Sequence, residues 1–140
     1  MDKREILAFI NKNPVAFMAT IDINGGKPHV RAMRTYSAND DGIVFNMETP
    51  KDVYKELSKN PEVELCYFTG GTQIRISGRM EELTDPALKR NHAINRPILQ
   101  PGVAKEGLDY VGIFILRHGK ATVLRPPLPV PGSPKVYIDM

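Results

Sequence analysis

The residues best suited to chemistry include two arginines on one short stretch, Arg31-Ala32-Met33-Arg34. From Pro28 to Tyr36 the side chains alternate in character with the period of a β-strand, so this stretch is predicted to be a strand. A planar guanidinium offers N–H donors whose geometry matches a phosphate. The stretch is therefore a candidate site for an anionic ligand.

A second candidate anion site lies between a predicted strand, residues 43–46, and a predicted helix, residues 50–60. Thr49 would supply a hydroxyl there, Lys51 a cation, and the first turn of the helix its free N–H groups. Isolated Arg and Lys side chains on a surface are usually only solvated. The prediction therefore depends on the combination of the two segments.

The elements expected to position these residues are mostly short strands. Apolar or alternating stretches bounded by turn residues predict strands over residues 15–21, 28–36, 43–46, 63–69, 73–83, 111–116 and 121–124. Helix signals predict helices that begin at Asp2, Pro50 and Asp85, whereas residues 95–108 are ambiguous. Six or seven short strands with few short helices predict a β-dominated α+β fold, an antiparallel barrel that is closed or partly closed.

The chain of 140 residues, 41% hydrophobic and 25% charged, has the length and composition of one domain. Five prolines from Pro126 to Pro134 exclude a helix or a central strand, so we expect a domain over residues 1–125 and a proline-rich tail or arm over residues 126–140. The chain has no apolar run long enough to span a bilayer and begins unlike a signal peptide. With its single cysteine, Cys66, these features favour a cytoplasmic protein that has no membrane partner.

The distribution of charge does not favour nucleic acid as a partner, and the spacing of the possible metal ligands does not favour a metal ion. The net charge is +3, and the basic residues are scattered rather than gathered in a stripe. The three histidines, His29, His92 and His118, and the single cysteine, Cys66, lack the spacing that gathers ligands around one ion. We therefore expect no metal site.

Four segments in order resemble the FMN-binding split barrel of the pyridoxamine 5′-phosphate oxidase family. They run from Pro28 to Arg34, Gly42 to Phe45, Lys51 to Pro61 and Gln73 to Glu81. The resemblance implies a six- to seven-stranded antiparallel split β-barrel, and a homodimer that builds each FMN site across its two-fold interface. The chain looks more like the small uncharacterised, general-stress and nitro-reducing members than like the vitamin B6 oxidases.

The resemblance also implies which residues hold the FMN phosphate. Arg31 and Lys51 would bind it, and Thr49 would assist. Arg34 would lie near the phosphate or the ribityl chain.

Further residues are implied at the flavin ring. Met33 and Asn46 would line the ring, and their neighbours in the chain, Ala32 and Met47, are included among the cofactor-binding residues. Gln73 would reach the flavin from the second subunit.

The chain departs from the oxidases that make pyridoxal phosphate at its C-terminal end. Their ending is rich in Trp and Arg, whereas this chain has no Trp and ends in the proline-rich segment after Arg125. We therefore expect an FMN-dependent oxidoreductase acting on another small molecule, with no catalytic residue identified. Two alternatives stay open: a flavin- or haem-binding sensor or storage protein without turnover, and a barrel that binds single-stranded nucleic acid.

Overall fold

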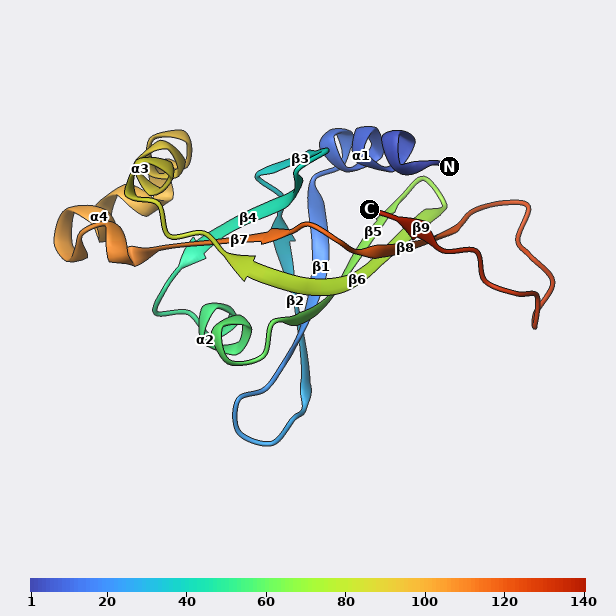
Figure 1. Cartoon of the computed structure of the whole chain (residues 1–140), viewed down its shortest axis with the longest axis horizontal. Helices are drawn as coiled ribbons and strands as arrows, with labels where there is room; N and C mark the ends of the chain where they lie inside the picture. The colour runs from blue at the N-terminus through green and yellow to red at the C-terminus, as the bar shows by residue number, and fades with distance from the viewer.

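The chain forms a curled antiparallel sheet that makes a half-barrel (Figure 1). The computed structural model describes all 140 residues. The sheet order is β2-β1-β5-β6-β7-β4-β3, with β8 paired to β6 and β9 paired to β8. The strands are β1 (Val15–Ile21), β2 (Pro28–Arg34), β3 (Ser37–Asn39), β4 (Gly42–Glu48), β5 (Glu62–Thr69), β6 (Thr72–Glu82), β7 (Val111–Leu116), β8 (Lys120–Leu124) and β9 (Ile138–Asp139).

The sheet curls because the backbone connects its two halves at two places. One half contains β2, β1, β5 and β8, the other contains β7, β4 and β3, and β6 belongs to both. The long strand β6 pairs with β8 along residues 73–77 and with β7 along residues 80–82. Between β2 and β3, the N–H of Thr35 donates to the Pro14 carbonyl at 2.7 Å, and the N–H of Tyr36 donates to the Val44 carbonyl at 2.8 Å. The backbone therefore leaves one ladder and joins the other within two residues.

The helices lie around the sheet at separate places. They are α1 (Lys3–Lys12), α2 (Asp52–Lys59), α3 (Pro86–Asn95) and α4 (Gln100–Glu106), with 3-10 turns η1 (Pro97–Leu99) and η2 (Leu108–Tyr110). Asp2 and Asp85 cap α1 and α3, because each side chain accepts a hydrogen bond from a backbone N–H of the first turn. Figure 1 shows α3 and α4 at one end of the sheet. None of these helices combines the length and the apolar character needed to cross a bilayer.

The main core is built from alternate side chains of the strands and from the buried faces of α1 and α2. Its largest fully buried side chains include Tyr67, Phe45 and Phe114. Strand β7 is buried on both faces, because Phe114 enters the main core whereas Val111 and Ile113 pack with residues of α3 and η1. The helices therefore cover faces that a single curled sheet would leave open.

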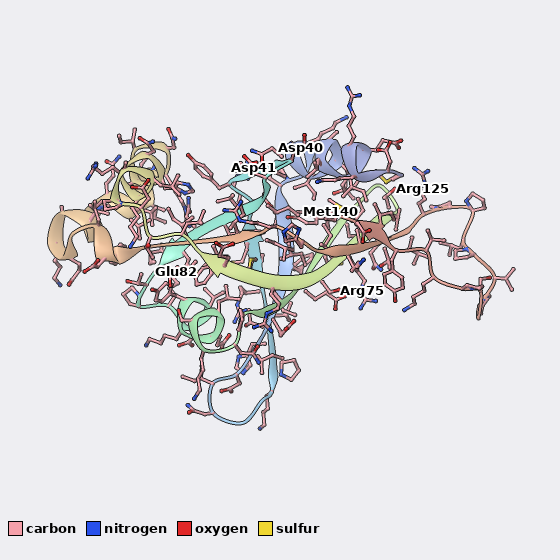
Figure 2. All side chains as sticks on the ribbon, viewed as in Figure 1. Asp40, Asp41, Arg75, Glu82, Arg125 and Met140 are labelled. Carbon is pink, nitrogen blue, oxygen red and sulfur yellow. The ribbon has the colours of Figure 1, made fainter.

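The last residues form an arm, residues 125–137, that leaves β8 and returns to the sheet as β9. Figure 2 places Arg125 at this end of the sheet and Glu82 toward the opposite end. No helix or strand forms within the arm.

The predicted fold class, an antiparallel split barrel, is confirmed. The seven predicted strands correspond to β1, β2 and β4 to β8. The short strands β3 and β9 were not predicted, and the ambiguous segment contains η1 and α4.

Candidate functional site

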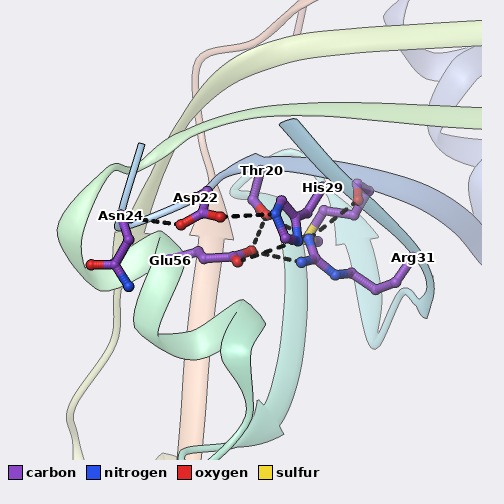
Figure 3. Close-up of polar contacts among 7 residues, drawn as sticks. Thr20, Asp22, Asn24, His29, Arg31 and Glu56 are labelled. Carbon is purple, nitrogen blue, oxygen red and sulfur yellow. Dashed lines mark hydrogen bonds and ion pairs between the residues drawn. The ribbon is translucent and has the colours of Figure 1, made fainter. Parts of the chain in front are cut away.

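The guanidinium of Arg31 lies at the centre of a polar network between β2, β1 and α2 (Figure 3). Its Nη2 is 2.7 Å from Oε1 of Glu56, and its Nη1 donates to Oγ1 of Thr20 at 2.6 Å. Thr20 in turn donates to the same Glu56 oxygen at 2.6 Å. A third, longer contact of 3.4 Å joins Nη1 to the Met18 carbonyl. The arginine is therefore held rigidly.

The rim of this network is formed by the β1–β2 hairpin. His29 Nε2 lies 3.1 Å from Oδ2 of Asp22, and His29 Nδ1 lies 3.9 Å from Oε2 of Glu56. The other oxygen of Asp22 accepts from the N–H of Asn24 at 2.6 Å, which fixes the turn. The hairpin and α2 are thus joined through one buried carboxylate.

The protonation state of Glu56 depends on the groups that surround its carboxylate. Burial by itself would raise the pKa of Glu56, but hydrogen bonds from Thr20 and Arg31 and the positive charge of Arg31 outweigh burial and lower it. The carboxylate is therefore ionised at neutral pH. Its side chain is 6% exposed and that of Arg31 is 23% exposed, so the arginine keeps an edge open to solvent.

The start of α2 carries the second predicted cluster. Lys51 is the N-cap residue of α2, is exposed and makes no side-chain capping hydrogen bond or ion pair. Thr49 is half-buried, and its hydroxyl donates to the Asp109 carbonyl at 2.9 Å. The structure therefore leaves the lysine free and engages the threonine.

The two arginines of β2 lie on opposite faces of that strand. Arg31 and Met33 pair with Met18 and Ala16, which point into the core, whereas Arg34 and Ala32 are exposed on the outer side. Gln73 of β6 is on the outer side too, three strands away from β2 in the sheet order. Within one chain, Arg31 contacts α2, whereas Gln73 lies away from both Arg31 and α2.

Asn46 lies in a second polar cluster beneath α3. Arg96 donates to its Oδ1 at 2.7 Å, so its amide nitrogen faces His92 Nδ1 at 2.9 Å. His92 must then accept with Nδ1, and its ring stacks on Tyr36 with centroids 3.7 Å apart. Burial lowers the pKa of His92 to about 4. Both ends of the Asn46 amide are therefore engaged, and the neighbouring Met47 is part of the main core.

Sequence reasoning missed Glu56, Thr20 and the Asn46 partners His92 and Arg96. A signal for Glu56 existed, because it shares the buried face of α2 with Val53 and Leu57 at helical spacing. A carboxylate on a buried helix face needs a cation or donors nearby. No group of three or more His, Cys, Asp or Glu side chains is arranged to hold a metal ion.

The curled sheet, the crossing from β2 to β3 and the position of α2 define a split-barrel protein with a candidate anion site beside that helix. The sequence model described as pyridoxamine 5′-phosphate oxidase matches residues 2–99. Since this match covers more than half of the chain, the chain belongs to the pyridoxamine 5′-phosphate oxidase family. The predicted family is thereby confirmed, and the family generally binds flavin and acts in redox reactions.

Individual relatives agree with this assignment. A pyridoxine/pyridoxamine 5′-phosphate oxidase from Ehrlichia ruminantium (strain Welgevonden) is 32% identical over 94 residues, which are 64% of this chain and 47% of the relative. The match therefore spans about half of that relative's length. This oxidase is a distant relative of the chain.

Solved structures show the same fold. A NimC/NimA family protein from Clostridium acetobutylicum aligns with a TM-score of 0.75 at 17% identity, covering 99% of this chain and 93% of that one. A protein related to general stress protein 26, also from Clostridium acetobutylicum, aligns with a TM-score of 0.64 at 16% identity, covering 100% and 97%. At these identities the likeness shows the fold alone.

Proposed function

We propose that this chain is an FMN-binding flavoprotein whose phosphate site is formed by Arg31, Lys51 and the first turn of α2. The observation that carries the proposal is the contact of Arg31 with Glu56, in a chain of this family. Glu56 lies four residues after Asp52, so its Cα is about 6 Å along the helix axis from the Cα of Asp52, and Arg31 contacts α2 through Glu56. The two segments predicted separately therefore meet at one helix.

The residues present fit a phosphate. Arg31 uses three of its five N–H donors within the chain, and its remaining donors and exposed edge are available to a ligand. Lys51 is unpaired, and the positive end of α2 has no side-chain cap. FMN carries nearly two negative charges on its phosphate, and each charge-assisted bond to it contributes about 1.5–3 kcal/mol.

The outer face of the sheet supports a homodimer. The outer face consists of the outward side chains of β1, β2, β5, β6 and β8. Its apolar residues include Val15, Phe17, Val30, Ala32, Phe68 and Leu124. Phe17 is 52% exposed and Phe68 is 60% exposed. Contiguous exposed apolar side chains mark interaction surfaces. Gln73 lies on this same face beside Phe68, where a partner's flavin would be within its reach.

Bound FMN would supply the redox chemistry. The chain's own part would be to fix the phosphate with Arg31 and Lys51, to exclude water through the dimer interface and to orient the ring against β2 and β4. We propose a cytoplasmic oxidoreductase that acts on a small molecule. Oxidation of a reduced nicotinamide by the FMN-loaded protein would distinguish this activity from a sensor or storage role.

A comparison of FMN with riboflavin tests the phosphate site, since riboflavin lacks only the phosphate. Wild type should bind FMN at least tenfold more tightly than riboflavin in a fluorescence-quenching titration. Lys51→Ala and the double variant Arg31→Ala, Glu56→Gln should each lose tenfold or more of that preference. The double variant removes both charges together, so it leaves no buried carboxylate unpaired.

The matched control is Lys105→Ala on α4, an exposed lysine at the α3 and α4 end of the sheet. It should keep the preference of wild type for FMN. Equal affinity of wild type for FMN and riboflavin, or failure to bind either, would overturn the proposal.

A further inference from the structure

The arm, residues 125–137, is tied to the sheet at both ends. It leaves at the end of β8, and its other end is held where β9 pairs with β8 at Lys120 and Ala121. The N–H of Met140 donates to the Gly119 carbonyl at 2.9 Å, and Lys120 forms an ion pair with Asp139. A segment of this length whose ends lie on one strand is a surface loop of the kind that frequently carries function.

The composition of the arm keeps it extended rather than collapsed on the sheet. Proline has a fixed φ and no N–H to donate, so the five prolines favour extended backbone. One turn reverses the chain, where the N–H and the hydroxyl of Ser133 both donate to the Val130 carbonyl, at 3.0 and 2.6 Å. Gly132 takes a φ of +88° in this turn, which glycine adopts without strain. Figure 1 shows the arm projecting from the sheet end opposite α3 and α4.

A cavity of about 530 Å³ lies between the arm and the ends of β6 and β8. This volume is within the range of sites for small organic molecules. Strands β6 and β8 supply Gln73, Arg75 and Leu124 to its wall, and the arm supplies Arg125, Lys135 and most of its prolines. Figure 2 shows Arg75 and Arg125 at this end of the sheet.

The lining of the cavity combines apolar walls with positive charge. Among its apolar side chains are Val123, Val130 and Ile138, and it includes no Asp or Glu. Arg75 is paired with Glu64 at 2.8 Å. Arg125 and Lys135, in contrast, have no ion-pair partner anywhere in the structure. Two uncompensated cations beside an apolar wall suit a ligand with an apolar body and an anionic group.

We infer that this arm cavity binds a small organic anion, an apolar molecule that carries a carboxylate or a phosphate. Gln73 lines the cavity and is also the residue that would contact the partner's flavin. The next step rests on the proposed function: the cavity is the substrate site of the oxidoreductase, and its substrate class is an apolar organic acid.

Calorimetric titration of the full chain with 2-naphthoate and with its neutral analogue 2-naphthamide tests the inference. Naphthoate should bind at least tenfold more tightly than naphthamide. The variant Arg125→Gln, Lys135→Gln should lose this difference. The control Arg90→Gln, Lys105→Gln removes the same charge from exposed positions on α3 and α4 and should keep it. Equal affinities in wild type, no binding of naphthoate at millimolar concentration, or an unchanged difference in the cavity variant would overturn the inference.

Two further titrations separate this inference from the proposed function. Naphthoate should bind to the phosphate-site variant Arg31→Ala, Glu56→Gln as tightly as to wild type, because neither residue lines the cavity. Binding of naphthoate in the cavity can therefore be tested even if the chain does not bind FMN. In the FMN-loaded protein, naphthoate should shift the visible absorption of the flavin, and a flavin spectrum that does not change would overturn the assignment of the cavity as the substrate site.

Discussion

Arg31 of β2 and Glu56 of α2 form an ion pair of 2.7 Å in which the carboxylate is almost fully buried. Strand β2 is at one end of the sheet order, so it has only one neighbouring strand to hold it. The ion pair and Thr20 attach this strand and its neighbour β1 to α2. The same contact fixes the guanidinium that we propose as a phosphate ligand, so structure and proposed function depend on one pair.

Replacing Glu56 by Gln should destabilise the protein by about 1–3 kcal/mol at pH 7, because the charge pair is lost while the size of the side chain is kept. The pKa of Glu56 is lowered in the folded state from its ordinary value of 4.5. Ionisation of Glu56 therefore stabilises the fold at pH values above 4.5, and this stabilisation is lost as the pH falls below 4.5. The difference between wild type and Glu56→Gln should therefore shrink below pH 4.5. Urea denaturation at several pH values measures it.

The exposed residue Glu106 of α4 provides the control for this prediction. Glu106→Gln should change the free energy of unfolding by less than about 0.5 kcal/mol at any of these pH values. A Glu56→Gln protein as stable as wild type at pH 7 would show that the ion pair does not stabilise the fold.

His92 should titrate near pH 4, because burial disfavours its charged form and Asn46 presents an amide N–H to its Nδ1. Its folded pKa is below the unfolded value of 6.5, so the folded state loses stability as the pH falls through this window, by about 3 kcal/mol in total. NMR titration of the imidazole signals measures the pKa directly. A His92 whose imidazole signals shift near pH 6.5, the ordinary value, would contradict the buried cluster.

Phe17→Asp on the outer face should convert the proposed homodimer to a monomer, because a charge would be buried in an apolar interface. Since the proposed FMN site needs both subunits, FMN binding should weaken as well. Analytical ultracentrifugation measures the mass. Ile94→Asp on α3 is the control, since Ile94 is also exposed but lies away from the outer face. A wild type that is monomeric at micromolar concentration would contradict this prediction.

Gly112→Ala should destabilise the fold by about 1–3 kcal/mol through overpacking against Tyr54. A Cβ at Gly112 would lie 2.6 Å from Cδ2 of Tyr54. The ring cannot move away freely, because its hydroxyl donates to Glu82 at 2.7 Å and its edge packs on Phe114. In a double-mutant cycle of thermal unfolding, Tyr54→Leu should recover part of the loss. Additive effects of the two substitutions would show that the ring is not the obstacle.

Much of the fold follows from local signals. The caps Asp2 and Asp85 mark the starts of α1 and α3, and alternation marks β2 and β5. Strands β3 and β9 have only three and two residues, too few to show a period, and β9 forms through pairing with β8 across the arm. Such non-local pairing leaves no local pattern in the sequence.

The candidate site was only partly predictable for a related reason. Residue type identified Arg31 and Lys51, because a guanidinium and a cation at a helix start are recognisable from sequence. The partner of Arg31 is 25 residues away in the chain. Only the fold shows that Glu56 lies there, that Arg34 is on the other face of β2, and that Asn46 is enclosed beneath α3.

The visible absorption spectrum of the freshly purified full chain, recorded before and after addition of FMN and removal of unbound flavin, tests the central claim most directly. The account predicts a protein that retains about one FMN per chain, with flavin bands shifted from those of free FMN. A protein that is colourless when purified and retains no added FMN would contradict the account.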